Sequence, residues 1–225
     1  QNIQFNWIKL EDTPDILAYP RHRVAWGRLT RLLSLGKRRA EKGGCILGLP
    51  DLLDHIEGLN LVVMPPPRIH AGRRGALMAR LKAAAPQSVW LAADMLYRGD
   101  DTRRIARLAD IAADAFVPLI AVNDVLYHHP NRRPLADVLT CIREKTTIDR
   151  AGRKLAINAE RYLKPPQEMS RLFRDAPEAV EETVALSDAL CFSLDELRYE
   201  YPDEEVQGFD SAQDALTHLT YEGAT

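Results

Sequence analysis

The fold is decided by the stretch from Ser88 to Asn123, which reads SVWLAADMLYRGDDTRRIARLADIAADAFVPLIAVN. The stretch opens with an apolar run over residues 88–93 and closes with another over 117–123, and each has the length of a strand. Between the two runs, Ile105, Leu108, Ala109 and Ala112 recur at the spacing of one helix face. Strand, helix and strand in this order are typical of parallel α/β units.

The residues before this stretch continue the same pattern. Asp15 to Ala18 predicts a short strand, Asn60 to Met64 predicts a strand buried on both faces, and residues 73–84 predict a basic helix. A helix is also expected after Tyr19-Pro20, with Gly36 at its end. In parallel sheets, chemistry gathers at the carboxyl ends of the strands, which points to Asp94 and to Asn123-Asp124.

The pattern changes after Pro134. Helices are expected over residues 135–142, after Pro165-Pro166 and over 178–190, and strands largely disappear. We therefore predict a boundary near residue 145, with an α/β part over 1–145 and a mainly helical part over 146–225.

Composition excludes several classes of protein. The chain is 46% apolar and 28% charged with a net charge of -2, which is typical of a soluble globular protein. No apolar run approaches the roughly 20 residues that cross a bilayer. The 3 cysteines are far apart and form no CxxC pair, which favours a reducing cytoplasm. The first residue is Gln1 rather than methionine, which suggests a piece of a longer protein.

Metal binding is the main chemical question that the residues raise. None of the 6 histidines lies in an HxH or HExxH motif. Asp124 with His128 and His129 is the one acidic and imidazole cluster at a predicted strand exit, and it would need further ligands from elsewhere. The alternative is a solvated loop in which the histidines cap or hydrogen-bond locally. GxSxG and phosphate-loop motifs are absent, and the pair Asp100-Asp101 is expected to be a solvated turn.

A basic surface is the second candidate. Residues 21–42 are rich in Lys and Arg, and Lys37, Arg38, Arg39 and Lys42 are the candidates for contact with a nucleic-acid backbone. The alternative is an ordinary amphipathic helix with a charged outer face.

Several long stretches resemble one family. They are DILAYP (15–20), WGRLTRLLSLGKRRAEKG (26–43), PLIAVNDVLYHHP (118–130), RPLADVLTCIREK (133–145), NAERYLK (158–164) and FSLDELRYEYP (192–202). Together they resemble the error-prone DNA polymerases of bacteria, C-family relatives of the replicative polymerase III alpha subunit.

The resemblance implies a fold. The family begins with a polymerase-and-histidinol-phosphatase domain, a (β/α)7-type barrel that holds up to three metals, followed by a linking region and the polymerase core. Residues 1–145 would be the later half of that domain, and residues 146–225 the helical passage to the palm. The expected fold is therefore α/β, a partial barrel of parallel strands followed by a mainly helical segment.

The resemblance also bears on the metal site. In metal-binding members a late strand ends in Asn-Asp-x-His, whereas here Asn123-Asp124 is followed by Val125 and Leu126. Leucine offers no lone pair, so Asp124 is expected to be a vestigial ligand that His128 could assist only if the loop curls back. A family cysteine expected after the strand near Leu61 is missing, with Met64 and three prolines in that region.

The function implied is that of a cytoplasmic, DNA-directed error-prone DNA polymerase acting in damage-induced mutagenesis and translesion synthesis. This piece is expected to be structural and inactive by itself, without a cofactor of its own, while Mg²⁺ and DNA belong to the parent polymerase. Other mutagenesis proteins or a sliding clamp are possible partners, and no membrane is expected. The alternatives are a metal-dependent phosphoesterase and a module that binds DNA or protein.

Half a barrel would leave apolar surface and strand edges exposed. We therefore expect that the segment lies within a longer chain, dimerises, or reorganises its sheet.

Overall fold

The computed structural model describes residues 6–8, 14–66, 71–198 and 208–224, without the side chains of 6–8 and 71–75. Its strands are β1 (Asn6–Ile8), β2 (Ile16–Pro20), β3 (Leu59–Val63), β4 (Val89–Asp94) and β5 (Leu119–Val122). Its helices are α1 (Arg23–Arg38), α2 (Leu49–Asp54), α3 (Ala71–Ala84), α4 (Asp101–Asp114), α5 (Arg133–Arg143), α6 (Ile148–Ala151), α7 (Pro166–Leu172), α8 (Glu178–Asp188) and α9 (Ala212–Gly223), with short 3-10 turns η1 (Pro130–Arg132), η2 (Gly152–Lys154) and η3 (Leu194–Glu196).

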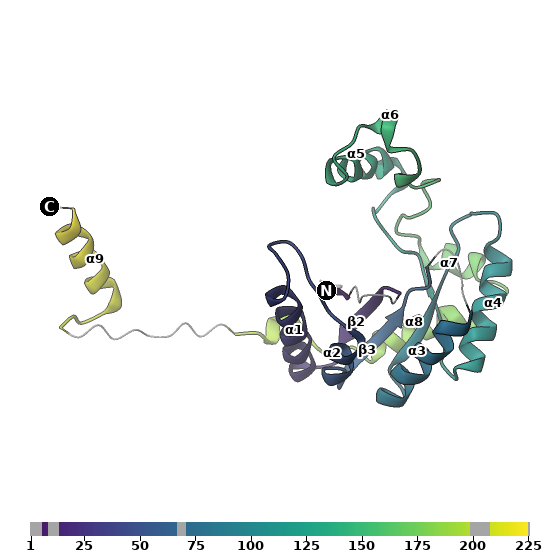
Figure 1. Ribbon diagram of the computed structural model, residues 1–225, viewed down its shortest axis with the longest axis horizontal. Coiled ribbons are helices and arrows are strands. Elements are labelled where there is room, and N and C mark those ends of the chain that lie inside the picture. The colour runs from purple at the N-terminus through teal and green to yellow at the C-terminus, as the bar shows by residue number, and fades with distance from the viewer. Residues whose placement is uncertain (1–5, 9–13, 67–70, 199–207, 225) are drawn as a thin grey trace. The chain divides into compact units, whose positions relative to one another are not determined.

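The five described strands form one mixed sheet in the order β1-β2-β3-β4-β5 (Figure 1). The pairs β3·β4 and β4·β5 are parallel, as the strand–helix–strand pattern predicts. The pairs β1·β2 and β2·β3 are antiparallel, so the expectation of parallel strands throughout is wrong. Only residues 9–15 separate β1 from β2, which are too few to carry the crossover that a parallel pair requires. The described sheet is open, and a barrel is not seen.

Helices of the first unit pack on both faces of the sheet. Alternate strand residues such as Leu61 and Leu91 enter a large core with α1 and α4. The intervening residues, among them Val62 and Trp90, form a second cluster with Leu186 of α8. The Trp90 indole N–H also donates to Glu182 of α8 at 2.8 Å. The second face of the described sheet is thus closed by a helix of the same chain.

Gly36 does not end α1, which continues to Arg38. The reason for a glycine at this position is packing, because a Cβ atom built on it would lie 2.5 Å from Cys45 Sγ and 2.7 Å from Leu47 Cγ. The loop after α1 crosses the helix at this point, and its backbone is tied there by the bond from Ile46 N to Gly36 O at 3.0 Å.

The chain divides into two compact units, residues 1–193 and 194–225. The predicted boundary near residue 145 lies inside the first unit, because α8 packs on β5. As a division between functional domains it stays a prediction. No helix within the described ranges has the length and apolar character that a membrane crossing requires.

Candidate functional site

The candidate site lies at the carboxyl ends of β4 and β5, where the two parallel strands deliver Asp94 and Asn123-Asp124 to the same edge of the sheet. Asp94 is the last residue of β4, and Asp124 lies two residues beyond β5 with a positive φ of 43°. Aspartate is one of the few residues that adopt this backbone conformation at low cost. The strand exits are thus occupied by the carboxylates that the sequence predicts there.

Asp94 is neutralised by two arginines. Its carboxylate oxygens lie 3.1 Å from Arg98 Nη1 and 3.3 Å from Arg104 Nε. Arg104 is itself buried, and its two terminal nitrogens donate to the carbonyls of Pro65 and Pro66 at 3.2 Å each. One guanidinium therefore joins the end of β4 to the chain that leaves β3.

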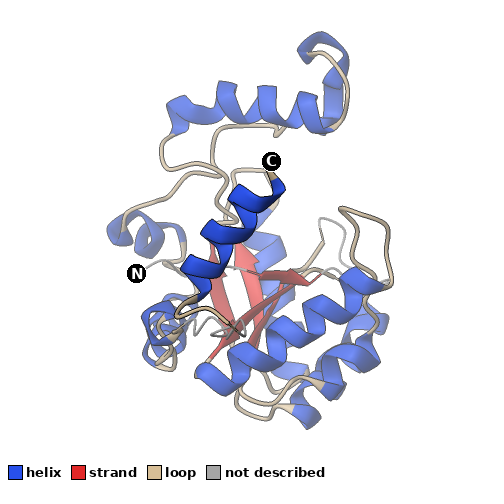
Figure 2. Cartoon of the chain, turned by 90° about the vertical axis from the view of Figure 1, so that its left-hand side faces the viewer, coloured by secondary structure: helices blue, strands red, loops and turns tan. Residues whose placement is uncertain are grey.

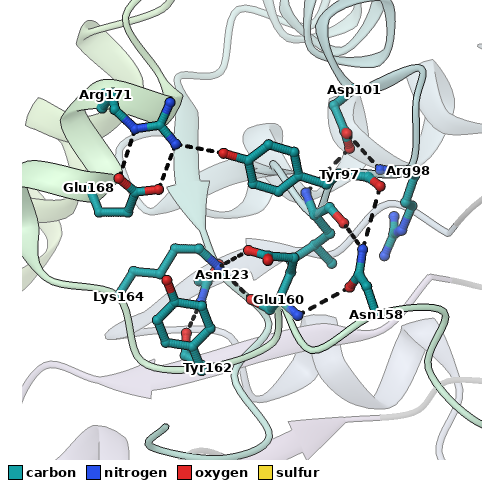
Figure 3. Close-up of polar contacts among 11 residues, drawn as sticks. Tyr97, Arg98, Asp101, Asn123, Asn158, Glu160, Tyr162, Lys164, Glu168 and Arg171 are labelled. Carbon is teal, nitrogen blue, oxygen red and sulfur yellow. Dashed lines mark hydrogen bonds and ion pairs between the residues drawn. The ribbon is translucent and has the colours of Figure 1, made fainter. Parts of the chain in front are cut away.

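Asp101 is buried, so the expectation that Asp100-Asp101 is a solvated turn is wrong for this residue. Its carboxylate accepts the backbone N–H of Leu96 at 3.3 Å and that of Arg98 at 2.8 Å. Burial is tolerated because the carboxylate is hydrogen-bonded, and the bonds fix the turn between β4 and α4 (Figure 3).

Asp124 is held by Arg161. The two side chains form an ion pair of 2.6 Å, and Arg161 Nε also donates to the Asp124 carbonyl at 2.8 Å. The segment that carries Arg161 runs beside the chain after β5, with Leu126 N on Arg161 O at 2.9 Å and Leu163 N on Tyr127 O at 3.0 Å. These bonds hold residues 158–164 beside the chain that follows β5, and we call residues 158–164 the return segment.

Lys164 anchors the end of this return segment (Figure 3). Its side chain is fully buried, and its ammonium lies 3.2 Å from both a Glu160 carboxylate oxygen and Asn123 Oδ1. It also lies 4.1 Å from the centre of the Tyr162 ring, a cation–π distance. A buried lysine requires such partners, since an unpaired ammonium in this position would be strongly destabilising.

Two further contacts lock the turn after β4 to the return segment and to α7. Asn158 donates to the carbonyl of Leu96 at 2.6 Å. The Tyr97 hydroxyl oxygen lies 2.5 Å from a terminal nitrogen of Arg171, and Arg171 binds Glu168 with two bonds of 2.8 and 2.7 Å. The Glu168 bonds, followed by Tyr97, raise the pKa of the guanidinium, and the same pairing lowers the pKa of the Glu168 carboxyl.

The charges of this cluster balance. The cluster holds five cations (Arg98, Arg104, Arg161, Lys164 and Arg171) and five carboxylates (Asp94, Asp101, Asp124, Glu160 and Glu168); the cations pair with four of these carboxylates, and backbone N–H groups bind Asp101. In the part of the chain that the structure describes, no three His, Cys, Asp or Glu side chains are grouped so as to hold a metal ion. At the β5 exit, the Asp124 carboxylate is bound by Arg161 at 2.6 Å.

The predicted ligand His128 is exposed, whereas Asp124 is paired with Arg161. Its neighbour His129 accepts the N–H of Asn131 at 3.3 Å and caps η1, which is the local role that the alternative interpretation gives to this pair. Whether Asp124 and His128 have any metal role stays a prediction.

The predicted basic surface lies at the end of α1. Lys37, Arg38, Arg39 and Lys42 are all exposed. Arg39 is paired with Asp51 at 2.7 Å, whereas the other three have no ion-pair partner among the described residues. Contact with nucleic acid at this surface stays a prediction.

Sequence reasoning missed Arg104, Arg161 and Lys164. One signal was present for Arg161 and Lys164, because both lie in NAERYLK, a stretch that carries the family resemblance. A strand-exit aspartate that lacks metal ligands requires another positive partner, and an arginine or lysine is the ordinary candidate.

Comparison with known proteins finds polymerases. The chain is 57% identical over 217 residues to the error-prone DNA polymerase of Bradyrhizobium sp. (strain ORS 278), 55% over 221 residues to that of Bradyrhizobium diazoefficiens, and 51% over 216 residues to that of Brucella abortus. These matches cover 94 to 96% of this chain but 18 to 20% of the relatives. No family model matches the chain. The chain spans about one fifth of the length of the curated relatives it matches, and over nearly all its residues it is similar to that segment of these error-prone DNA polymerases.

Proposed function

We propose that the chain is a scaffold segment of an error-prone DNA polymerase. The parent protein would carry out template-directed nucleotidyl transfer in the cytoplasm during damage-induced mutagenesis and translesion synthesis. DNA and Mg²⁺ would be bound by other parts of the parent. The similarity to relatives that are about five times longer supports this proposal.

The observation that carries the scaffold role is the charge-balanced cluster at the strand exits. Catalytic carboxylates need a free oxygen for a metal or a proton, since a metal centre works through open coordination positions. Here Asp94 and Asp124 are each bound by guanidinium groups at 2.6 to 3.3 Å. This arrangement favours a structural tie over a hydrolytic centre.

In this proposal the α/β part descends from the later half of a polymerase-and-histidinol-phosphatase barrel. The parallel order β3-β4-β5 supports that origin. The residues after 145 would lead toward the polymerase core, with α8 closing the sheet face that faces the interior in a complete barrel.

The test is a chimeric polymerase in which this chain replaces its 57% identical counterpart in the Bradyrhizobium sp. enzyme. We expect the chimera to extend a primer and the isolated 225-residue chain to incorporate no nucleotide. Arg161→Ala in the chimera should lower the temperature at which activity is lost, and leave kcat/KM at low temperature within about twofold. The matched control is Arg153→Ala, an exposed arginine without a described ion-pair partner.

Two results would overturn the proposal. Nucleotide incorporation by the isolated chain would show that it holds an active centre of its own. Hydrolysis of a phosphodiester by the isolated chain with added Mn²⁺, lost in Asp124→Asn, would show that the strand exits are catalytic.

A further inference from the structure

Helix α5 presents its apolar side to solvent. Leu135, Val138, Leu139 and Ile142 are 55%, 41%, 57% and 68% exposed, and they follow the i, i+3, i+4, i+7 spacing of a single helix face. We call these four residues the α5 stripe. A surface helix normally turns such a stripe toward its own core, so this helix is oriented the opposite way.

The face of α5 that turns inward is polar and small. Arg133 donates to the carbonyl of Ala156 at 2.7 Å and pairs with Asp137 at 3.4 Å, one helical turn along. Cys141, on the same face, is buried, and its carbonyl accepts the N–H of Thr146 at 2.9 Å. These contacts fix the rotation of α5 about its axis, and this rotation is what points the stripe toward solvent.

The base of α5 is also fixed. The chain enters the helix through Tyr127, whose carbonyl accepts the N–H of Leu163, and the return segment is tied there by the Arg161–Asp124 pair. From this base, α5 and α6 extend as an arm away from the sheet (Figures 1 and 2), and η1 and α6 are the main packing partners of α5. The described residues of the first unit therefore leave the α5 stripe uncovered.

The charge around the stripe restricts what can cover it. Residues 128–154 contain seven Lys or Arg against three Asp or Glu, a net charge of +4 in a chain whose total is -2. Arg132, Lys145, Arg150 and Arg153 are exposed and have no ion-pair partner among the described residues. A second copy packed stripe to stripe would bring like charges together, whereas a surface with acidic borders would be attracted.

We infer that the α5 stripe is a docking site for an amphipathic helix with acidic borders in another part of the same polymerase polypeptide. The inference rests on the proposed function, because the matched relatives contain about four fifths of their length outside the segment. A helix of this kind would pack its apolar face on the four side chains of the stripe and place its carboxylates against Arg132 and Lys145.

Thiol accessibility tests this inference. Leu139→Cys is introduced into the isolated chain and into the chimeric polymerase, and its alkylation by iodoacetamide is followed by peptide mass spectrometry, which separates it from Cys45, Cys141 and Cys191. We expect alkylation at least tenfold slower in the chimera than in the isolated chain. Arg153→Cys, on the same arm but outside the stripe, should react at the same rate in both proteins.

Every other outcome overturns the inference. Equal rates for Leu139→Cys in both proteins would show that the rest of the polymerase leaves the stripe uncovered. Protection in the isolated chain that increases with protein concentration would identify a second copy as the occupant. Primer extension by the same chimera is measured in parallel, so an active chimera with an unprotected cysteine refutes the docking site and leaves the proposed function standing.

Discussion

The Arg161–Asp124 pair is the contact whose removal tests the reasoning most directly. The pair has an ion-pair distance of 2.6 Å and a second bond of 2.8 Å to the backbone, and the two side chains are 28% and 19% exposed. A hydrogen bond to a charged group contributes about 1.5–3 kcal/mol when buried, and exposure moves this value toward the lower contribution of a surface pair. We therefore expect Arg161→Ala to lower the free energy of unfolding by about 2 kcal/mol.

A double-mutant cycle separates the pair from other effects. Asp124→Asn is the suitable second change, because asparagine also adopts the positive φ of 43° at this position. In urea unfolding, Arg161→Ala should cost about 1–2 kcal/mol less in the Asp124→Asn background than in the unchanged chain. Arg153→Ala, as the matched control, should stay within about 0.5 kcal/mol of the unchanged chain.

The reasoning fails if the coupling energy is below about 0.3 kcal/mol, since the two residues would then be energetically independent. It also fails if Mn²⁺ raises the unfolding temperature of the unchanged chain but not of Asp124→Asn. That result would mean that the carboxylate prefers a metal to the guanidinium.

Four further predictions concern other parts of the molecule. Lys164→Met should lower the free energy of unfolding by about 2–3 kcal/mol, because the Glu160 carboxylate loses its ion-pair partner at a buried position. A urea midpoint equal to that of the unchanged chain would contradict this. Hydrogen bonding to Arg39, then to Gly48 N–H, lowers the pKa of Asp51 below its ordinary 3.8, so this stabilisation is present above pH 3.8 and is lost as pH falls further. The unfolding temperature of Asp51→Asn should therefore fall less in acid than that of the unchanged chain. Burial raises the pKa of Tyr19 from 10.0 to about 12, so as pH rises this tyrosine ionises in the unfolded chain before it ionises in the folded chain. The free energy of unfolding should therefore fall as pH rises above 10.0, and it should fall less steeply in Tyr19→Phe. The same pH dependence of the free energy of unfolding in both proteins would refute this. Lys37→Ala with Arg38→Ala should weaken the binding of duplex DNA, measured by fluorescence anisotropy. The slope of the logarithm of the binding constant against the logarithm of salt concentration should decrease by about one for each phosphate that is no longer neutralised. Unchanged binding would remove the basic surface from consideration.

The sequence allowed the central elements to be predicted because their apolar patterns are strong. The apolar runs over residues 60–64 and 88–93 predict strands, and the observed β3 and β4 match them within one residue at each end. The parallel direction of β3, β4 and β5 follows from the helices between them, but the direction of β2 could not be predicted from its short apolar run, and β2 is antiparallel to β3. The covering of the second face by α8 depends on tertiary packing, which periodicity does not encode.

The candidate site was predictable in place but not in chemistry. The topological rule for parallel strands located Asp94 and Asp124 correctly. Their partners could not be found by spacing, because Arg161 lies 37 residues beyond Asp124 and no local motif joins them. Asp101 was misjudged because a polar turn sequence does not reveal whether backbone N–H groups will converge on its carboxylate.

A guanidinium and a divalent metal both compensate a buried carboxylate, but they have different consequences. A metal lowers the pKa of a bound water and keeps a coordination position for substrate, whereas arginine remains protonated and offers only fixed donors. Arginine is also part of the chain, so its bond to Asp124 ties residues 158–164 to the end of β5. The same segment holds the base of α5 through Leu163 and Tyr127. The Arg161–Asp124 ion pair thus links the end of β5 to the segment that supports the base of α5 and its stripe.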